Sequence, residues 1–294
     1  MAGAAAFPGP IGNPVTIATE RYAAILGATP SKGARSPTLW NAAFKAAGID
    51  AVMHPMDVTA ADLPAVVAAL KADPRFVGGA VAVPHKQALV GLLDRIEPEA
   101  QRIGAVNAIY RDGDALVGAN TDGAGALSQI EELVGGAHAL QTRRALVVGL
   151  GGAGLAMAAF LAGRVTELTV ANRTRATADA VAAKLGAMAA DFPVGADVLS
   201  KIDLVVNATT IGHKDGPAGS PIAEADLAVL PASAAVYDAI YQPDATPLLT
   251  MAAARGLQTR NGLGMNLDQA VIAFGKAVPG ALGMDAVRAA MRAA

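Results

Sequence analysis

The chain has 294 residues, enough for one large domain or two of ordinary size. Hydrophobic residues make up 53% and charged residues 16% of it, so it can bury a sizeable core and is not a disordered chain. Its 23 Lys and Arg nearly balance 25 Asp and Glu, and without a basic field neither nucleic acid nor a membrane surface is an expected partner. The lack of cysteine excludes disulfides, iron–sulfur clusters and thiolate nucleophiles and suits the reducing cytoplasm.

No targeting signal or membrane span is expected. The opening MAGAAAFPGP lacks the positive charge and the long apolar run of a signal peptide. Residues 145–163 carry no charge and approach the length of a bilayer-spanning helix. Glycines crowd the segment Gly149–Gly154, however, and they would weaken such a helix. A strand, a glycine turn and a buried helix explain the stretch better, so a soluble, cytoplasmic protein is expected.

In chain order, a poorly ordered arm is predicted over residues 1–20, followed by alternating strands and helices. The strand patterns cover residues 22–27, 49–56 and 76–83. A helix is expected to begin at Ser36, as an N-cap before proline, and to end at Gly48. Another follows Thr59 and Asp62, whose spacing resembles a capping box. This β-α-β-α-β order predicts a parallel sheet.

A second alternation is predicted after a helix over residues 121–133 and a connector that leads to Arg144. Strands are expected at 144–149, 167–172, 203–209 and 234–240, and helices at 152–163 and 174–185. From Gly262 onward only helices are expected. Two α/β units with a helical tail are therefore predicted.

The segment GLGGAG (149–154) has the G-x-G-x-x-G spacing of dinucleotide-binding turns and lies between a predicted strand and a predicted helix. Gly149 would permit a tight turn, Gly151 would let the backbone approach a pyrophosphate, and Gly154 would let the helix pack closely on the strand. Gly152 opens the helix, whose free N–H groups favour phosphate. The alternative is a glycine-rich turn between buried elements, with no ligand.

The end of the following strand distinguishes between nicotinamide cofactors. An NAD site carries an acidic residue there, which binds the ribose 2′-hydroxyl. This chain has Asn172, Arg173 and Thr174 instead. Arginine pairs with a phosphate, and its neighbours can donate hydrogen bonds to the same group. NADP is therefore favoured over NAD, although an exposed arginine at a helix start is also common.

A nicotinamide enzyme also needs a group that exchanges the proton of the alcohol. No metal is expected, because the chain has no cysteine and its 4 histidines lack paired spacing. Lys86 follows the third predicted strand, at a carboxyl end where α/β sheets bind ligands, and Asp122 begins a helix. A lysine beside a carboxylate can exchange protons. Spacing alone also allows these two residues to be a surface charge and a helix cap.

Several segments, in this order, resemble shikimate dehydrogenases. They are VPHK (83–86), GAVNAI (104–109), GANTDGAG (118–125), GLGGAG (149–154), NRT (172–174), NATTIG (207–212), YDAIYQPDATPLL (237–249) and GLGMNLDQA (262–270). The resemblance implies an α/β fold with a substrate domain of residues 1–122 and 265–294, a Rossmann-type NADP-binding domain of residues 123–264, and C-terminal helices that pack on the first domain. It also implies reversible reduction of 3-dehydroshikimate to shikimate, with NADP as cofactor, in aromatic amino-acid synthesis.

The same resemblance implies roles for individual residues. Lys86 resembles the catalytic lysine of the family and Asp122 its hydrogen-bonded partner. The substrate residues would be Ser36 and Tyr241 at the carboxylate and Asn107 and Gln269 at the ring hydroxyls. The cofactor residues would be Gly149, Gly151, Gly152, Gly154, Asn172, Arg173, Thr174, Gly264 and Met265, with Thr209 and Thr210 near them.

Three alanines depart from the family pattern. Ala34 stands where the family has a serine, and Ala80 and Ala82 replace an asparagine and a threonine. Ser31 or Arg35 could compensate. The substitutions keep open a paralogous dehydrogenase for a quinate-like or less hydroxylated acid, and a non-catalytic NADP-binding regulator is a further alternative. A monomer or homodimer acting on a small molecule is expected.

Overall fold

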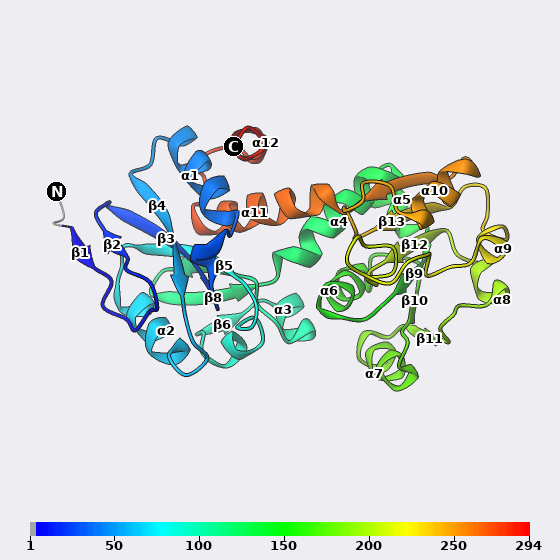
Figure 1. Cartoon of the computed structure of the whole chain (residues 1–294), viewed down its shortest axis with the longest axis horizontal. Coiled ribbons are helices and arrows are strands. Elements are labelled where there is room, and N and C mark those ends of the chain that lie inside the picture. The colour runs from blue at the N-terminus through cyan, green and yellow to red at the C-terminus, as the bar shows by residue number, and fades with distance from the viewer. Residues whose placement is uncertain (1–3) are drawn as a thin grey trace. The chain divides into compact units, whose positions relative to one another are not determined.

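The computed structural model describes residues 4–294. The chain divides into two compact units: residues 1–121 with 267–294, and residues 122–266. Each unit contains a six-stranded sheet covered by helices (Figure 1). The chain passes from one unit to the other in the first turns of two helices, α4 (Thr121–Val134) and α11 (Leu263–Ala277).

The elements of the first unit come from both ends of the chain. Its strands are β1 (Ala5–Ala6), β2 (Thr16–Ile17), β3 (Arg21–Gly27), β4 (Ala51–Asp57), β5 (Phe76–Val81), β6 (Arg95–Ile96), β7 (Ala108–Asp112) and β8 (Ala115–Ala119). Its helices are the 3-10 turns η1 (Pro30–Lys32) and η2 (Ala88–Gly91), with α1 (Ser36–Ala46), α2 (Leu63–Ala72), α3 (Pro98–Ile103) and α12 (Met284–Arg292).

The elements of the second unit form one continuous stretch of chain. Its strands are β9 (Arg144–Val148), β10 (Glu167–Ala171), β11 (Met188–Ala190), β12 (Leu204–Asn207), β13 (Ala235–Asp238) and β14 (Gln258–Asn261). Its helices, besides α4, are α5 (Ala137–Gln141), α6 (Gly152–Leu161), α7 (Arg175–Leu185), α8 (Ala196–Leu199), α9 (Glu224–Leu227) and α10 (Pro247–Ala254).

The sheet of the first unit has the order β4-β3-β5-β7-β8-β6. Its three predicted strands, β3, β4 and β5, are parallel as expected, whereas β7 and β8 form an antiparallel hairpin beside them. Because side chains alternate along a strand, Tyr22, Ala24 and Leu26 of β3 pack with α2. Ala23 and Ile25 pack on the other face with α1, α11 and α12 (Figure 1).

The prediction of a poorly ordered N-terminal arm is wrong for the described part of that segment. Strands β1 and β2 pair as an antiparallel ribbon, and Phe7, Val15 and Ile17 are buried in the core on the α2 face of the sheet. These apolar side chains are too widely spaced to produce a periodic pattern, so their burial was not visible in the sequence. Residues 1–3 of the predicted arm lie outside the described part of the chain.

Two predicted helix starts differ slightly from the structure. Ser36 is the first residue of α1 rather than its N-cap, a position held by Arg35. The Thr59–Asp62 pair makes the expected capping contacts, with the Asp62 N–H donating to Thr59 Oγ1 at 3.2 Å and that hydroxyl donating to Asp62 Oδ2 at 2.6 Å. The α-helix itself begins only afterwards, at Leu63.

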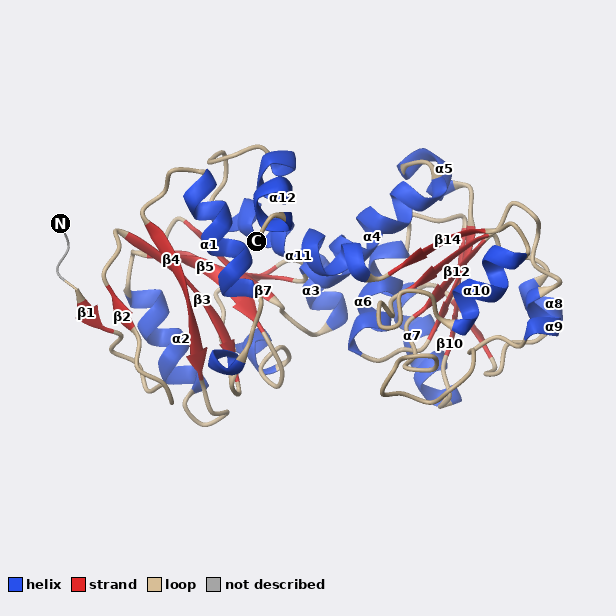
Figure 2. Ribbon diagram, turned by 45° about the horizontal axis from the view of Figure 1, so that its top comes forward, coloured by secondary structure: helices blue, strands red, loops and turns tan. Residues whose placement is uncertain are grey.

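The sheet of the second unit is parallel throughout, in the order β11-β10-β9-β12-β13-β14. One face packs against α4, α6 and α7 and the other against α8, α9 and α10 (Figure 2). Burial on both faces explains why β9 and β12 are apolar at almost every position. The uncharged stretch 145–163 is β9, a turn and α6, and no helix of residues 4–294 is long and apolar enough to span a membrane.

Candidate active site and cofactor pocket

Two predicted substrate residues of the first unit, Asn107 and Gln269, lie together at one edge of its sheet. Strand β7 is antiparallel to both β5 and β8. The end of β5, the start of β7 and the end of β8 therefore lie on the same side of the sheet, at the ends of its strands, and "edge" here means that side. The register aligns Ala80, Ala108 and Ala119 across these three strands. The turn after β5, the segment before β7 and the start of α4 are therefore brought together, and they carry the predicted Lys86, Asn107 and Asp122.

Three polar side chains contact one another at this edge. Asn107 Oδ1 accepts a hydrogen bond from the Thr121 backbone N–H at 2.6 Å. Gln269 Oε1 lies 3.4 Å from Asn107 Nδ2 and 3.5 Å from Thr121 Oγ1. Asn107 and Thr121 are buried, so their bonds fix the amide groups that could face a ligand. The structure thus unites the predicted Asn107 and Gln269, and it adds Thr121, which the sequence did not single out.

Lys86 lies in the turn after β5, and hydrogen bonds of Lys86 itself and of the preceding residue hold this turn in place. Its carbonyl accepts from the Val106 N–H at 2.7 Å, one residue before Asn107. The preceding His85 is buried, and its Nε2 donates to the Val58 carbonyl at 2.8 Å. Asp122 follows Thr121 directly, in the first turn of α4. The sheet therefore brings the Lys86 turn to the edge from which α4 starts.

A pocket of about 310 Å³ opens beside the ends of β3 and β5. Its lining residues are Gly27, Ala28, Thr29, Pro30, Lys32, Gly33, Ala34, Ala82 and Val83. Two of the three departures from the family pattern, Ala34 and Ala82, thus form part of its wall. Ala80 does not, because it is buried in the apolar core beneath α1 and α11. The wall lacks the hydroxyl groups that the family pattern would supply at two positions.

Neither proposed substitute for the lost serine lines this pocket. The Ser31 hydroxyl donates to Asp57 Oδ2 at 2.5 Å, and its backbone N–H donates to Asp57 Oδ1 at 2.9 Å. Asp57 is held in turn by Asn13, whose Oδ1 accepts from the Asp57 N–H at 2.7 Å. Arg35 is exposed, and the cationic side chain in the wall is that of Lys32.

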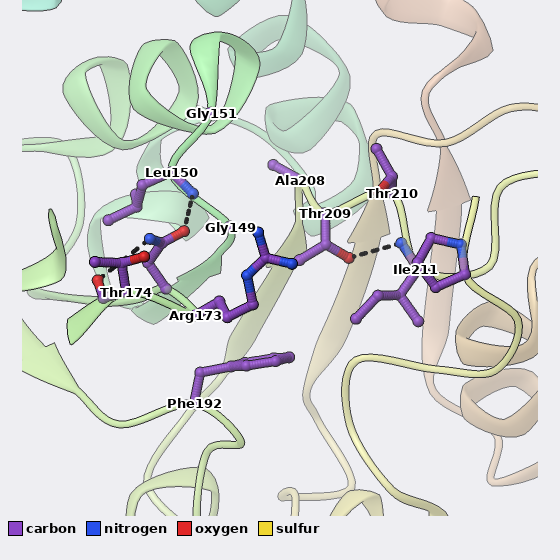
Figure 3. A pocket seen from close by; sticks show the side chains of 12 residues that line it. Gly149, Leu150, Gly151, Arg173, Thr174, Phe192, Ala208, Thr209, Thr210 and Ile211 are labelled. Atoms are coloured by element: carbon purple, nitrogen blue, oxygen red, sulfur yellow. Dashed lines mark hydrogen bonds between the residues drawn. The ribbon is translucent and has the colours of Figure 1, made fainter. Parts of the chain in front are cut away.

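A second pocket, of about 410 Å³, lies in the second unit at the carboxyl ends of β9, β10 and β12 (Figure 3). Its lining residues are Gly149, Leu150, Gly151, Asn172, Arg173, Thr174, Phe192, Ala208, Thr209, Thr210, Ile211 and Pro217. The sequence singled out the glycines, the Asn172–Thr174 turn and the two threonines. Phe192 and Pro217 were missed, since they come from loops that only the fold brings to this place.

The glycines of the turn have different reasons for lacking a side chain. Gly149 has φ +90°, a conformation that strongly favours glycine. A Cβ on Gly154 would lie 1.9 Å from the Gly149 carbonyl oxygen, so close helix–strand packing requires glycine there. A Cβ on Gly151 would meet no atom within 4 Å. Because Gly151 lines the pocket, its open space suits a bound group that must approach the backbone.

The turn after β10 presents the groups expected to select the cofactor. Asn172 Oδ1 accepts from the Leu150 N–H at 3.1 Å, and Asn172 Nδ2 donates to the Thr174 carbonyl at 3.3 Å (Figure 3). Asn172 thereby ties the glycine turn to the next strand. Arg173 is exposed, and its side chain extends along the pocket. The guanidinium is placed to meet a phosphate carried by a ligand.

None of the predicted catalytic and substrate residues lines either pocket, and neither do Gly264 and Met265. Tyr241 is exposed and follows β13 in the second unit. Gly264 packs against α4, because a Cβ there would lie 2.2 Å from Gln129 Oε1, and Met265 packs against the apolar core beside α4 and α6. Their assignment to substrate and nicotinamide stays a prediction. Among residues 4–294, no cluster of His, Asp and Glu side chains is suited to hold a metal ion.

Two family profiles match the chain, one over each unit. The "Shikimate dehydrogenase substrate binding domain" matches residues 26–109, and "Shikimate / quinate 5-dehydrogenase" matches residues 131–214. The shikimate dehydrogenase (NADP(+)) of Citrifermentans bemidjiense is 42% identical over 86% of this chain and 88% of its own.

Solved structures agree with these profiles. Shikimate 5-dehydrogenase of Thermus thermophilus, in complex with NADP(H) and shikimate, is 32% identical with a TM-score of 0.74, over 93% of this chain and 99% of its own. Quinate dehydrogenase of Corynebacterium glutamicum, in complex with NAD, is 29% identical with a TM-score of 0.79, over 94% of this chain and 99% of its own. With identity of this order across both units, the chain belongs to the shikimate dehydrogenase family.

Proposed function

We propose that the chain is an NADP-dependent dehydrogenase that reversibly reduces 3-dehydroshikimate to shikimate. The observation that carries the proposal is the pocket at the end of β10, where Arg173 replaces the acid of an NAD site beside a glycine turn. The first unit is the substrate domain and the second the NADP-binding domain. The lack of cysteine favours a reducing compartment, so we place the activity in the cytoplasm, as a monomer or a homodimer.

The cofactor would be held by backbone and side chains of the second unit. The first turn of α6 directs free N–H groups at the pyrophosphate, and Gly151 leaves room for it. Arg173 binds the 2′-phosphate, with Thr174 as a second donor. Once bound, NADP supplies or accepts the hydride.

The proton is exchanged by residues of the first unit and the start of α4. Lys86, as an ammonium group, donates to the carbonyl oxygen that becomes the alcohol, and in reverse it takes that proton back. Asp122, as its hydrogen-bond partner, would orient the ammonium group. Asn107 and Gln269 bind ring hydroxyls, while Ser36 and Tyr241 meet the carboxylate. The roles of Lys86, Asn107 and Gln269 rest on the resemblance and on the convergence of segments at the sheet edge, whereas those of Ser36 and Tyr241 rest on the resemblance alone.

The test is oxidation of shikimate by the full chain with NADP, followed through NADPH absorbance. Lys86→Ala should lower kcat by roughly 10²–10⁴-fold, the contribution of a positioned proton-transfer group. Lys45→Ala removes an exposed lysine from α1 of the same unit and should change nothing. Absence of turnover at saturating shikimate and NADP would refute the proposal.

A related acid with fewer hydroxyls is the second candidate substrate. The observation that favours it is the wall formed by Ala34 and Ala82, which offers methyl groups to a ligand. A buried substrate hydroxyl without a partner would cost about 1–3 kcal/mol. A panel of shikimate, quinate and less hydroxylated cyclohexene carboxylates decides between the candidates, and a wide preference for shikimate would eliminate this one.

A further inference from the structure

A fully buried carboxylate, Asp238, ends strand β13 and has no part in the mechanism above. The parallel register places it beside Asn207, the last residue of β12. Asp238 Oδ1 accepts from Asn207 Nδ2 at 2.9 Å and from the Ile240 N–H at 3.0 Å. Asp238 Oδ2 accepts from the hydroxyl of Thr246, the N-cap of α10, at 2.6 Å. Every one of these partners is a neutral donor.

These bonds fix the direction of the Asn207 amide. Asp238 Oδ1 accepts and the Thr209 N–H donates, so the Nδ2 end of Asn207 must face Asp238 and its Oδ1 end must face Thr209. Asn207 Oδ1 accepts from the Thr209 N–H at 2.9 Å and from the Thr209 hydroxyl at 2.8 Å. The Thr209 hydroxyl in turn accepts from the Ile211 N–H at 3.2 Å (Figure 3). The carboxylate thus determines how the 207–211 loop is held.

That loop forms one wall of the cofactor pocket. Thr209 and Ile211 both line it, and Thr209 lies against the glycine turn. A Cβ on Gly149 would lie 2.8 Å from Thr209 Cγ2, so the loop and the turn are already in close contact. A small shift of Thr209 would therefore change the width of the pocket where the turn meets the cofactor.

Stability alone does not account for a carboxylate at this place. Burial raises the pKa of Asp238, which means that the protein environment disfavours its charged form. Well-packed apolar residues often stabilise such a site more than a buried charge does. A charge that accepts three hydrogen bonds does, however, impose one arrangement on its neighbours.

We propose that Asp238 is a positioning residue for the cofactor pocket: through Asn207 it holds the Thr209–Ile211 loop in the shape that receives NADP. The inference rests on the NADP site of the proposed function.

Direct binding of NADP to the full chain, measured by calorimetry, tests this role. Asp238→Ala leaves the donors of Asn207 and Ile240 without their acceptor, and it should raise the Kd for NADP about tenfold. Asp238→Asn retains an acceptor oxygen for those donors and should raise the Kd only about threefold. If Asp238→Ala does not fold, Asp238→Asn is compared with the control in its place.

The matched control is Asp203→Asn, just before β12 and at the opposite end of that strand from Asn207. Asp203 Oδ2 accepts from the Arg144 N–H at 3.1 Å and from Arg144 Nε at 3.0 Å, far along the strand from the pocket loop. This variant should lower the melting temperature but leave the Kd for NADP within twofold of wild type.

A double-mutant cycle asks whether the effect passes through Thr209. Thr209→Val keeps a methyl group against Gly149 but removes the hydroxyl. In the Thr209→Val background, Asp238→Ala should therefore raise the Kd for NADP by much less than tenfold. Unchanged NADP binding in Asp238→Ala, full additivity in the cycle, or an equal loss in Asp203→Asn overturns the inference. If the wild-type chain does not bind NADP, the proposed function fails, and this inference with it.

Discussion

Arg173 stands at the end of β10, where a dinucleotide-binding sheet meets the ribose of its cofactor. The residue two positions further on provides a contrast. Arg175 forms ion pairs with Asp179 at 2.8 Å and Asp191 at 2.6 Å, and it does not line the pocket. Two arginines on one turn are therefore used differently, one toward the pocket and one toward the surface of its own unit.

Arg173→Ser should weaken NADP binding about 10- to 100-fold, because a charged hydrogen bond to phosphate contributes roughly 1.5–3 kcal/mol. The KM for NAD should change little, so the ratio of kcat/KM for the two cofactors reports the loss. Arg175→Ser is the matched control and should leave this ratio unchanged. Equal losses with NAD and NADP would contradict the role of Arg173 at the 2′-phosphate.

Ala34 and Ala82 line the first pocket, and their role can be tested by restoring the hydroxyl residues of the family pattern. If shikimate is the substrate, the double change Ala34→Ser and Ala82→Thr should raise kcat/KM for shikimate about 5- to 20-fold, through one or two new hydrogen bonds. Ala80→Asn is the control, because Ala80 lies in the apolar core and an amide there should lower the melting temperature without improving activity. A fall in kcat/KM for shikimate in the double variant would favour the less hydroxylated substrate.

Site residues with local signals could be predicted, and those defined only by the fold could not. Gly149 and Gly154 follow from a short motif, because a turn and a helix start are local events. Thr121 and Asp238 belong to no short motif that assigns them a contact, and only strand register shows that they contact Asn107 and Asn207. One clue was present: Asn207 and Asp238 each end an apolar strand, at the sheet edge where α/β folds place their ligands.

At the scale of elements, most of the parallel strands were predictable, because each of these is largely an apolar run. The β7–β8 hairpin was missed, although Asp112-Gly113 is a strong turn signal and Gly113 has φ +60°. Strand β14 has the polar sequence QTRN, and only its pairing with β13 makes it a strand. The short β11 is likewise defined by β10. Edge strands of this kind carry little signal of their own.

The contact between α6 and β9 predicts opposite effects for two glycines of one helix. Gly154→Ala should destabilise the protein by about 1–3 kcal/mol or more, because its Cβ would lie 1.9 Å from a carbonyl oxygen. Gly152→Ala meets no atom within 4 Å, so alanine's better helix propensity should be neutral or stabilising by about 0.5–1 kcal/mol. The melting temperatures of the two ligand-free variants measure both changes in stability. Similar changes in the two variants would contradict the close packing at Gly154.

At the scale of the whole molecule, the two units differ in how the chain builds them. The second is one uninterrupted stretch with its own apolar cores on both faces of its sheet. The first needs both chain ends, because Val271 and Phe274 of α11 and Met291 of α12 pack into the core beneath α1. Two cuts can therefore excise the second unit as one continuous stretch of chain, whereas the first unit would be left as two separate pieces.

A fragment of residues 121–266 should fold and bind NADP within about tenfold of the full chain, while showing no dehydrogenase activity. Circular dichroism checks the fold and calorimetry the binding, with Arg173→Ser in the same fragment as control. A folded fragment that does not bind NADP would contradict the assignment of the cofactor pocket to this unit alone.

The N-terminal ribbon has a practical consequence for anyone who shortens this protein. The substrate-domain profile begins at residue 26, inside β3, and a gene trimmed to that boundary would discard Phe7, Val15 and Ile17. Each contributes about 1.5–3 kcal/mol of burial. The trimmed gene would also lose Asn13, which binds the backbone N–H of Asp57, the residue that holds Ser31 through two hydrogen bonds. Affinity tags and fusion partners therefore belong ahead of residue 4, and homology alone is a poor guide to where this enzyme's first indispensable residue lies.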